Sequence, residues 1–144
     1  MASSHLTARI ASGVDGALPN LATPFLRCVG ERASKMQWHV RNADLILHPP
    51  HTVVEFDRAT QRALAYDEIL ALLDRISVLN EITIFVPEKD LGDDELNKQL
   101  IRRDYSAFKI CIDLWDSSEW TFVSDSVSEL ECAAAVVGDP DQAI

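Results

Sequence analysis

The histidines are the residues of this chain best suited to hold a metal ion, so we consider their spacing first. His48 and His51 flank two prolines, and this H-P-P-H spacing lacks the i, i+4 geometry of a helical zinc pair. His5 and His39 stand in no motif relation to them. The pattern indicates an exposed turn, and we expect neither a metal site nor a cofactor.

The three cysteines, Cys28, Cys111 and Cys132, are far apart and form no CxxC motif. An odd number of widely spaced cysteines argues against a disulfide framework and for a reducing compartment. We therefore expect three small, buried apolar side chains and a cytoplasmic protein.

Two carboxylates, Glu55 and Asp57, are two residues apart on a predicted strand and would share one face. Paired carboxylates can perform acid–base chemistry where burial separates their pKa values. Here the alternation turns Val54 and Phe56 inward and leaves both acids in solvent. This pair therefore does not predict catalysis.

No catalytic motif occurs in the sequence: there is no G-x-S-x-G elbow, no H-E-x-x-H and no Walker-type loop. Gly92 comes closest to a phosphate loop, but the acids Asp93 and Asp94 that follow it would repel a phosphate. A Cys–His or Ser–His pair assembled from distant residues stays open as an alternative. We expect a protein that is not an enzyme.

Negative charge is concentrated in the second half of the chain. The net charge is −10, and after Lys109 there is no Lys or Arg while eight acids follow. Such a distribution repels nucleic acid and attracts basic proteins. No apolar run approaches the ~18 residues of a membrane span. We therefore expect a basic protein partner, no direct contact with nucleic acid and no membrane segment.

The clearest secondary-structure pattern is an alternating run over residues 108–115, followed by turn residues 116–118 and a second strand from residue 119. One face of the first strand carries Phe108, Ile110, Ile112 and Leu114. A three-residue loop would place Trp115 opposite Glu119 and bring Trp120 and Phe122 to that apolar face. Because burial selects the register, we predict this hairpin.

The other face of this hairpin supplies the candidate partner-binding residues. Trp115 would stand beside three acids, Asp113, Asp116 and Glu119. An aromatic anchor within an acidic rim is typical of a hot spot for a basic partner. The alternative is that a helix of the same domain covers Trp115.

Other elements follow from periodicity, caps and breakers. Helices are expected at 23–34, 67–79, 93–103 and 126–137, the last with the capping-box spacing Ser126-x-x-Glu129. Strands are expected at 38–41, 45–47, 53–57 and 82–86. Residues 58–66 are predicted to form a hairpin strand, with one long helix over 58–79 as the alternative.

Together these elements predict an α+β fold, with a mixed, mainly antiparallel sheet of about five to seven strands packed against three to four helices. Residues 1–22 are expected to be a loosely ordered N-terminal arm and residues 23–144 a single domain. With 144 residues, of which 47% are hydrophobic, the chain can supply a core without disulfides or metal.

In size, charge and element mix the chain resembles two groups of proteins: the immunity proteins that neutralise bacterial toxins, and the small acidic chaperones of secretion systems. The resemblance includes no alignable motif and implies no site residues. The leading hypothesis is a cytoplasmic immunity or inhibitor protein, a monomer or weak dimer, that blocks the active site of a basic toxin or nuclease. A secretion or assembly chaperone is the alternative, and a small ligand-binding enzyme domain is the third.

Overall fold

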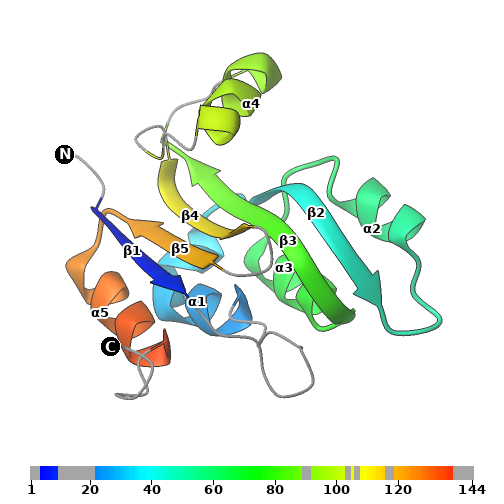
Figure 1. Ribbon diagram of the computed structural model, residues 1–144, viewed down its shortest axis with the longest axis horizontal. Coiled ribbons are helices and arrows are strands. Elements are labelled where there is room, and N and C mark those ends of the chain that lie inside the picture. Colours follow the sequence, from blue (N-terminus) through cyan, green and yellow to red (C-terminus); the bar gives the residue numbers. More distant parts are fainter. Residues whose placement is uncertain are drawn as a thin grey trace.

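The computed structural model describes residues 4–9, 22–88, 92–102, 105, 108–115 and 119–137. In chain order its elements are β1 (Ser4–Arg9), α1 (Ala22–Val29), the 3-10 helix η1 (Gly30–Lys35), β2 (His39–Leu47), α2 (Val53–Ala59), α3 (Tyr66–Leu73), β3 (Ile76–Pro87), α4 (Asp93–Arg102), β4 (Phe108–Trp115), β5 (Glu119–Ser124) and α5 (Val127–Val137) (Figure 1). Most of the predicted N-terminal arm, residues 10–21, lies outside the described residues.

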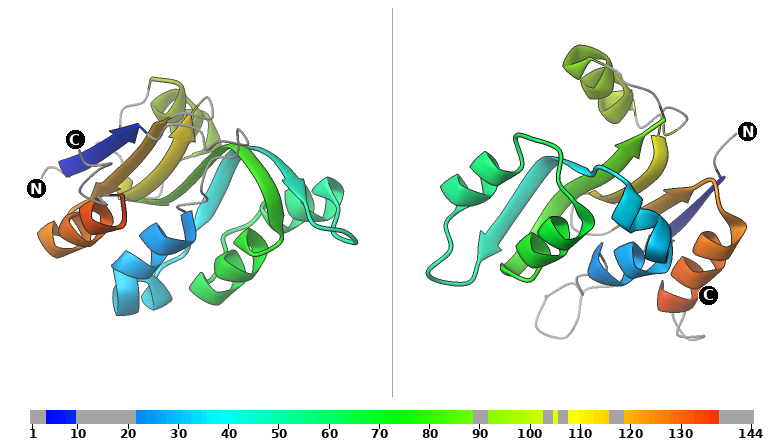
Figure 2. Two further views of the ribbon diagram at one scale, coloured as in Figure 1. Left: turned by 60° about the horizontal axis from the view of Figure 1, so that its bottom comes forward. Right: turned by 180° about the vertical axis from the view of Figure 1, so that it is seen from behind.

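The strands form one open sheet in the order β1-β5-β4-β3-β2, and every described pair is antiparallel. Seen from behind, α1, η1, α3 and α5 lie across one face of this sheet (Figure 2). The main core lies between this face and these helices. A smaller cluster on the opposite face is built around Phe85 and Phe108, with Leu96 of α4. Among the described elements, α1, η1, α3 and α5 therefore cover one face, and α4 packs on the other near Phe85.

The predicted fold class was wrong in its details, although the chain does combine helices with a sheet. The sheet is antiparallel throughout rather than mixed, and five α-helices rather than three to four are described. The predicted number of strands was also wrong: four strands with described side chains, β2 to β5, make up the sheet instead of five to seven, and β1 adds an edge. The two expected strands at 38–41 and 45–47 are one strand, while 53–57 and 58–66 contribute none.

Residues 53–59 form a helix because its N-terminus is capped. The Thr52 side chain accepts a hydrogen bond from the Glu55 backbone N–H, 3.2 Å long. Only Phe56 of this helix is buried, so the alternating pattern did not mark a strand. Residues 58–66 form neither the predicted hairpin nor a long helix: α2 ends at Ala59, α3 begins at Tyr66, and a single bridge joins Leu64 to Trp38.

The segment Ile76–Leu79, predicted as the end of a helix, instead begins strand β3. Its apolar residues fit either period, and pairing with β2 decides between them, since Ile76 lies opposite Leu47 and Leu79 opposite Leu45. The break expected between the strands 38–41 and 45–47 is a bulge within β2. Asn42 has a φ of 56°, a left-handed conformation that asparagine tolerates better than most residues.

The predicted hairpin register is confirmed. Trp115 pairs with Glu119, Leu114 with Trp120 and Ile112 with Phe122. The position of Phe108 was predicted wrongly, because it belongs to the smaller cluster on the opposite face. An irregularity in the β3–β4 pairing between Val86 and Pro87 breaks the alternation there.

The expectation of three unlinked cysteines was also wrong. Cys28 of α1 and Cys132 of α5 form a disulfide, with Cα atoms 5.6 Å apart and a sequence separation of 104. Only Cys111 is a buried free thiol. Spacing along the chain could not reveal the link, because it depends on the packing of the first helix against the last.

A cluster of ion pairs also connects the first helical segment to α5, near the disulfide. Arg32 of η1 donates from Nε and Nη2 to the two carboxylate oxygens of Glu129, at 2.8 and 2.6 Å, and its Nη1 lies 2.6 Å from Asp125. Burial lowers the pKa of Arg32, but the hydrogen bonds to Glu129 and Asp125 outweigh it and raise the pKa above its usual value. Arg32 therefore carries its positive charge, and the carboxylates of Glu129 and Asp125 neutralise that charge.

The predicted capping box at the start of α5 is only half formed. The Glu129 backbone N–H donates to Ser126 Oγ at 3.4 Å, as such a box requires. The Glu129 side chain, however, accepts hydrogen bonds from Arg32 and from Ser124 Oγ instead of from the Ser126 backbone, which donates to Ser124. The tertiary contact with Arg32 therefore replaces the second hydrogen bond of the capping box.

A surface carboxylate should make folding stability depend on acid pH. Glu68 of α3 has its pKa lowered to about 2 by hydrogen bonds from the Arg62 guanidinium and the Ala65 backbone N–H. A lowered folded-state pKa stabilises the fold above the ordinary carboxylate pKa, and this stabilisation is lost as pH falls toward 2. Urea unfolding of wild type and Glu68→Ala should therefore differ most near neutral pH and converge near pH 2. A difference that is constant with pH would contradict this assignment.

Candidate functional site

A polar row crosses the face of the sheet opposite the helices α1, α3 and α5. Cross-strand pairing aligns Arg41 of β2, Thr83 of β3, Asp113 of β4 and Thr121 of β5. The last three are buried although they are polar. Buried polar groups need hydrogen-bond partners, so this row has a defined arrangement rather than a solvated one.

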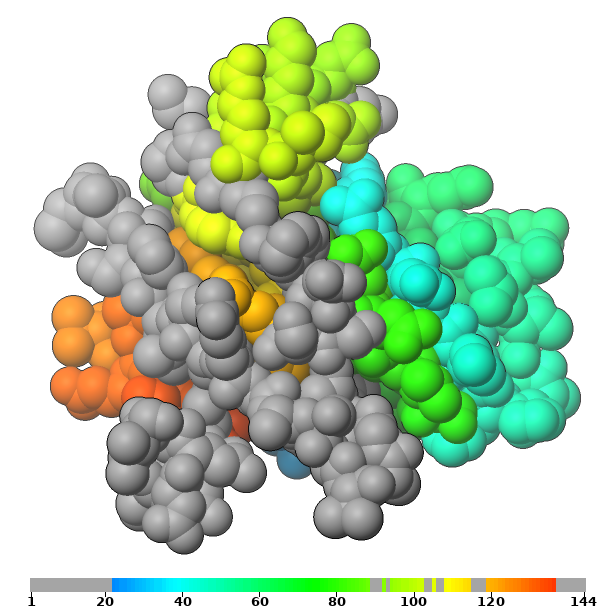
Figure 3. Space-filling model, in the orientation of Figure 1, coloured from blue at the N-terminus to red at the C-terminus, as the bar shows by residue number. Residues whose placement is uncertain are grey.

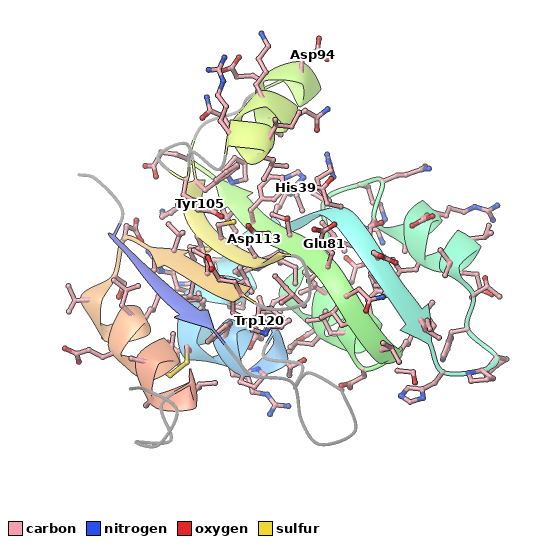
Figure 4. All side chains as sticks on the ribbon, viewed as in Figure 1. His39, Glu81, Asp94, Tyr105, Asp113 and Trp120 are labelled. Carbon is pink, nitrogen blue, oxygen red and sulfur yellow. A yellow bond between two sulfur atoms is a disulfide. The ribbon has the colours of Figure 1, made fainter. Side chains whose placement is uncertain are left out.

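Asp113 lies at the centre of the row, where both of its carboxylate oxygens are engaged. Thr83 Oγ1 donates to Oδ1 at 2.8 Å, and the Tyr105 hydroxyl donates to Oδ2 at 2.7 Å. Figure 4 shows Asp113 between Tyr105 and Glu81. The carboxylate is therefore held in place by its neighbours, unlike the freely rotating acid of an exposed hairpin rim.

A pocket of about 480 Å³ opens beside Asp113. Its lining combines three acids, two other polar residues and three apolar ones: Asp44, Glu81, Asp113, Asn42, Thr83, Ala43, Leu100 and Ile101. Asp44 and Glu81 are cross-strand partners, next to the bulge of β2. Like charges placed opposite one another on a sheet destabilise it, so the fold by itself does not favour this pair.

Helix α4 forms one wall of this pocket. Leu96 anchors the helix in the smaller apolar cluster, while Ile101 lies at the pocket with 82% of its surface exposed. In the space-filling view α4 stands at one end of this face, and atoms of β2 and β3 reach the surface beside it (Figure 3). The pocket thus offers carboxylates on the sheet and aliphatic surface on the helix.

The predicted partner-binding residues are only partly brought together. Asp113 lines the pocket, while Trp115 and Glu119 are paired at the end of the β4–β5 hairpin. Glu119 is half-buried. The Trp115 side chain and all of Asp116 lie outside the described residues. Whether these four residues contact a partner stays a prediction.

Sequence reasoning missed Asp44 and Glu81. The two acids are 37 positions apart, and nothing local to either one marks it as part of a site. The signal that could have found them is the pairing of their strands, since the antiparallel strands β2 and β3 place Asp44 opposite Glu81. That pairing was hidden because residues 76–79 were assigned to a helix.

The other candidate residues lie away from this pocket. His48 and His51 flank the turn between β2 and α2, and among the described residues no group of three or more His, Cys, Asp or Glu could hold a metal ion. Glu55 and Asp57 are exposed on helix α2 rather than on a strand. Asp57 lines a second pocket, of about 390 Å³, beside β2.

Comparison with known proteins adds no assignment to this site. No protein-family model matches the chain, and no match was found among curated proteins or solved structures. Within the described part of the chain, no helix is long and apolar enough to cross a membrane. Function must therefore be argued from the pocket and its surroundings.

Proposed function

We propose that this protein is a non-enzymatic, acidic binding module, an immunity or inhibitor protein that neutralises a basic toxin or nuclease by covering its active site. The observation that carries the proposal is the pocket in which acids from three strands, Asp44, Glu81 and Asp113, meet on the face of the sheet opposite α1, α3 and α5. A net charge of −10 would draw a basic partner toward the molecule before contact.

The lining of the pocket suits a lysine or arginine side chain of such a partner. These side chains carry a cationic head on an aliphatic stem. The head would meet the carboxylates, with Asp113 already oriented by Thr83 and Tyr105, and the stem would lie along Leu100 and Ile101. A toxin that cleaves or binds phosphates uses such cations itself, so occupying them would block it.

The contact residues of the proposal are those predicted from sequence, Asp113, Trp115, Asp116 and Glu119, together with the pocket acids Asp44 and Glu81. The hairpin that carries the first four is adjacent in the sheet to the strand that carries Glu81. One binding surface could therefore include both groups.

A small cationic ligand is the second candidate for the pocket, because its volume and polar lining also suit a small molecule. The chaperone alternative has less support. Six large aliphatic side chains are well exposed among the described residues: Ile46, Val53, Val54, Val78, Ile101 and Val127. Ile46 and Val78 are cross-strand partners, and the other four are divided among α2, α4 and α5. A chaperone would be expected to gather such residues in one groove.

We propose the bacterial cytoplasm as the compartment, where an immunity protein would meet an incoming toxin. Thiols are kept reduced there. The Cys28–Cys132 disulfide would then form only under oxidising conditions.

The test begins with a partner, captured on the immobilised chain at low salt and released by salt. Association kinetics are then compared for wild type, Asp44→Lys/Asp116→Lys and a matched control, Asp67→Lys/Asp74→Lys, which makes the same charge change on and beside helix α3. The first variant should associate about tenfold more slowly or worse, and the control much less so. Asp113 is left intact because a lysine there would be buried among its hydrogen-bond donors.

Two further measurements test the proposal: the salt dependence of association and the effect of Trp115→Ala on dissociation. Wild-type association should slow as salt rises, since screening limits exposed charges to about 8–10 Å near physiological ionic strength. Trp115→Ala should act on the dissociation rate, with a loss of about 2 kcal/mol or more if it is a central anchor. Salt-independent association at equal rates in all variants would show that the interface does not include these residues.

A further inference from the structure

Helix α5 is joined to the first helical segment by two different cross-links. The Cys28–Cys132 disulfide links it to α1, and the carboxylate of Glu129 binds Arg32 of η1. The disulfide is drawn as a yellow bond between the two helices (Figure 4). Both cross-links join the same two parts of the molecule, and one of them depends on the redox state.

Helix α5 buries few apolar side chains. Among its described side chains only Ala133 is a fully buried apolar residue, while Leu130 and Val136 are partly buried. Val127, the first residue of the helix, is 71% exposed. Strand β4 differs strongly, since Ile110, Cys111, Ile112 and Leu114 are all fully buried. Weakly buried elements are the ones that open locally while the rest of a protein stays folded.

The position of α5 also allows it to detach alone. It is not part of the sheet, so its departure leaves the pairing of β2 to β5 intact. Among the described elements it packs mainly on α1, β1 and β5. Its departure would therefore uncover the β1–β5 side of the sheet and the surface of α1.

The disulfide joins an exposed residue, Cys132, to a half-buried one, Cys28, so it lies outside the fully buried core. We propose that the Cys28–Cys132 disulfide is a redox latch for helix α5: the closed disulfide holds the helix on the sheet, and its reduction lets the helix open locally.

The chemistry of the latch is thiol–disulfide exchange with a cellular thiol such as glutathione or a dithiol protein. The thiolate attacks the Cys132 sulfur, the Cys28–Cys132 bond breaks, and Cys28 leaves as a thiolate that takes up a proton. A second thiol attacks the mixed disulfide and releases Cys132. The disulfide gains two electrons and two protons, and the reductant becomes a disulfide. The inference does not depend on the proposed partner.

Hydrogen exchange read by mass spectrometry tests the latch on the full chain. The samples are wild type oxidised, wild type reduced with a phosphine, and Cys28→Ser/Cys132→Ser. Reduced wild type and the double variant should exchange α5 amides about tenfold faster or more than oxidised wild type, while β3 and β4 stay within about twofold. The Glu-C protease gives a second readout, since it should cut after Glu129 and Glu131 of α5 only in the reduced protein.

A further variant separates the two cross-links. Glu129→Gln weakens the ionic one, and its α5 should stay protected while the disulfide is closed but open more than wild type once it is reduced. If the double variant does not fold, the reduced wild-type chain still answers the question. Equal α5 protection in both redox states would overturn the latch. So would simultaneous loss of protection in α5, β3 and β4, or three free thiols after treatment with oxidised glutathione.

Discussion

Replacing Ile112 by alanine is expected to lower the free energy of unfolding by about 2–5 kcal/mol, as for other buried aliphatic residues. Ile112 is fully buried in the middle of β4, between Ile84 of β3 and Phe122 of β5. Truncation there removes apolar surface from the core and leaves a cavity that paired strands on both sides cannot close. Urea unfolding at neutral pH measures the loss.

The matched control for this substitution is Ile101→Ala. It removes the same atoms from a side chain that is 82% exposed on helix α4. Surface changes of this kind fall within about ±0.5 kcal/mol. Similar losses for the two variants, or a loss below about 0.5 kcal/mol for Ile112→Ala, would show that the β4–β5 register or the packing of this face is wrong.

The second large effect is expected from Glu129→Ala. Glu129 is buried and accepts hydrogen bonds from Arg32 and from Ser124 Oγ, the latter at 2.6 Å. Removing one partner of a buried ion pair costs about 3–5 kcal/mol, because the other charge stays partly desolvated. Arg32 keeps Asp125 and is about one-third exposed, so we expect the lower end of this range. The measurement is made on the oxidised protein, in which the disulfide still holds α5.

A surface pair of the same chemistry provides the comparison. Arg62 and Glu68 also form an Arg–Glu ion pair, but both side chains are well exposed. Solvent screens such pairs, so Glu68→Ala should change the unfolding free energy far less than Glu129→Ala. Equal effects would mean that the Arg32 cluster is an ordinary surface pair and does not fix α5.

These two predictions concern different parts of the molecule. Ile112 belongs to the main core, whereas Glu129 belongs to the attachment of the last helix. If α5 is the least firmly held element, Glu129→Ala should speed hydrogen exchange in α5 once the disulfide is reduced, and Ile112→Ala should speed exchange throughout the sheet.

Features that depend on neighbouring residues were the ones that the sequence determined. The β4–β5 hairpin could be predicted because alternation over eight residues and a short loop leave one register in which Trp120 and Phe122 are buried. The start of α5 was equally local, since Ser126 caps the backbone N–H of Glu129. The burial of Cys111 was expected from its residue type alone, whereas the alternation placed it on the face opposite the predicted apolar one.

Features that depend on distant partners were decided by the tertiary structure. Residues 53–57 fit a strand or a helix, and only the cap at Thr52 and the single buried contact of Phe56 settle the choice. Residues 76–79 became a strand because β2 offered partners for them. In short apolar segments the local preferences for helix and strand are nearly equal, so non-local pairing decides.

The candidate site and the disulfide also combine properties that the sequence determines with contacts that only the fold creates. The net charge of −10 can be counted from the sequence, and it predicts the kind of partner. The meeting of Asp44, Glu81 and Asp113 requires three strands to pair across 69 positions, and the Cys28–Cys132 link requires the first and last helices to pack together. Charge is a sum over residues and needs no fold, whereas proximity between distant residues exists only once the chain has closed the loops between them.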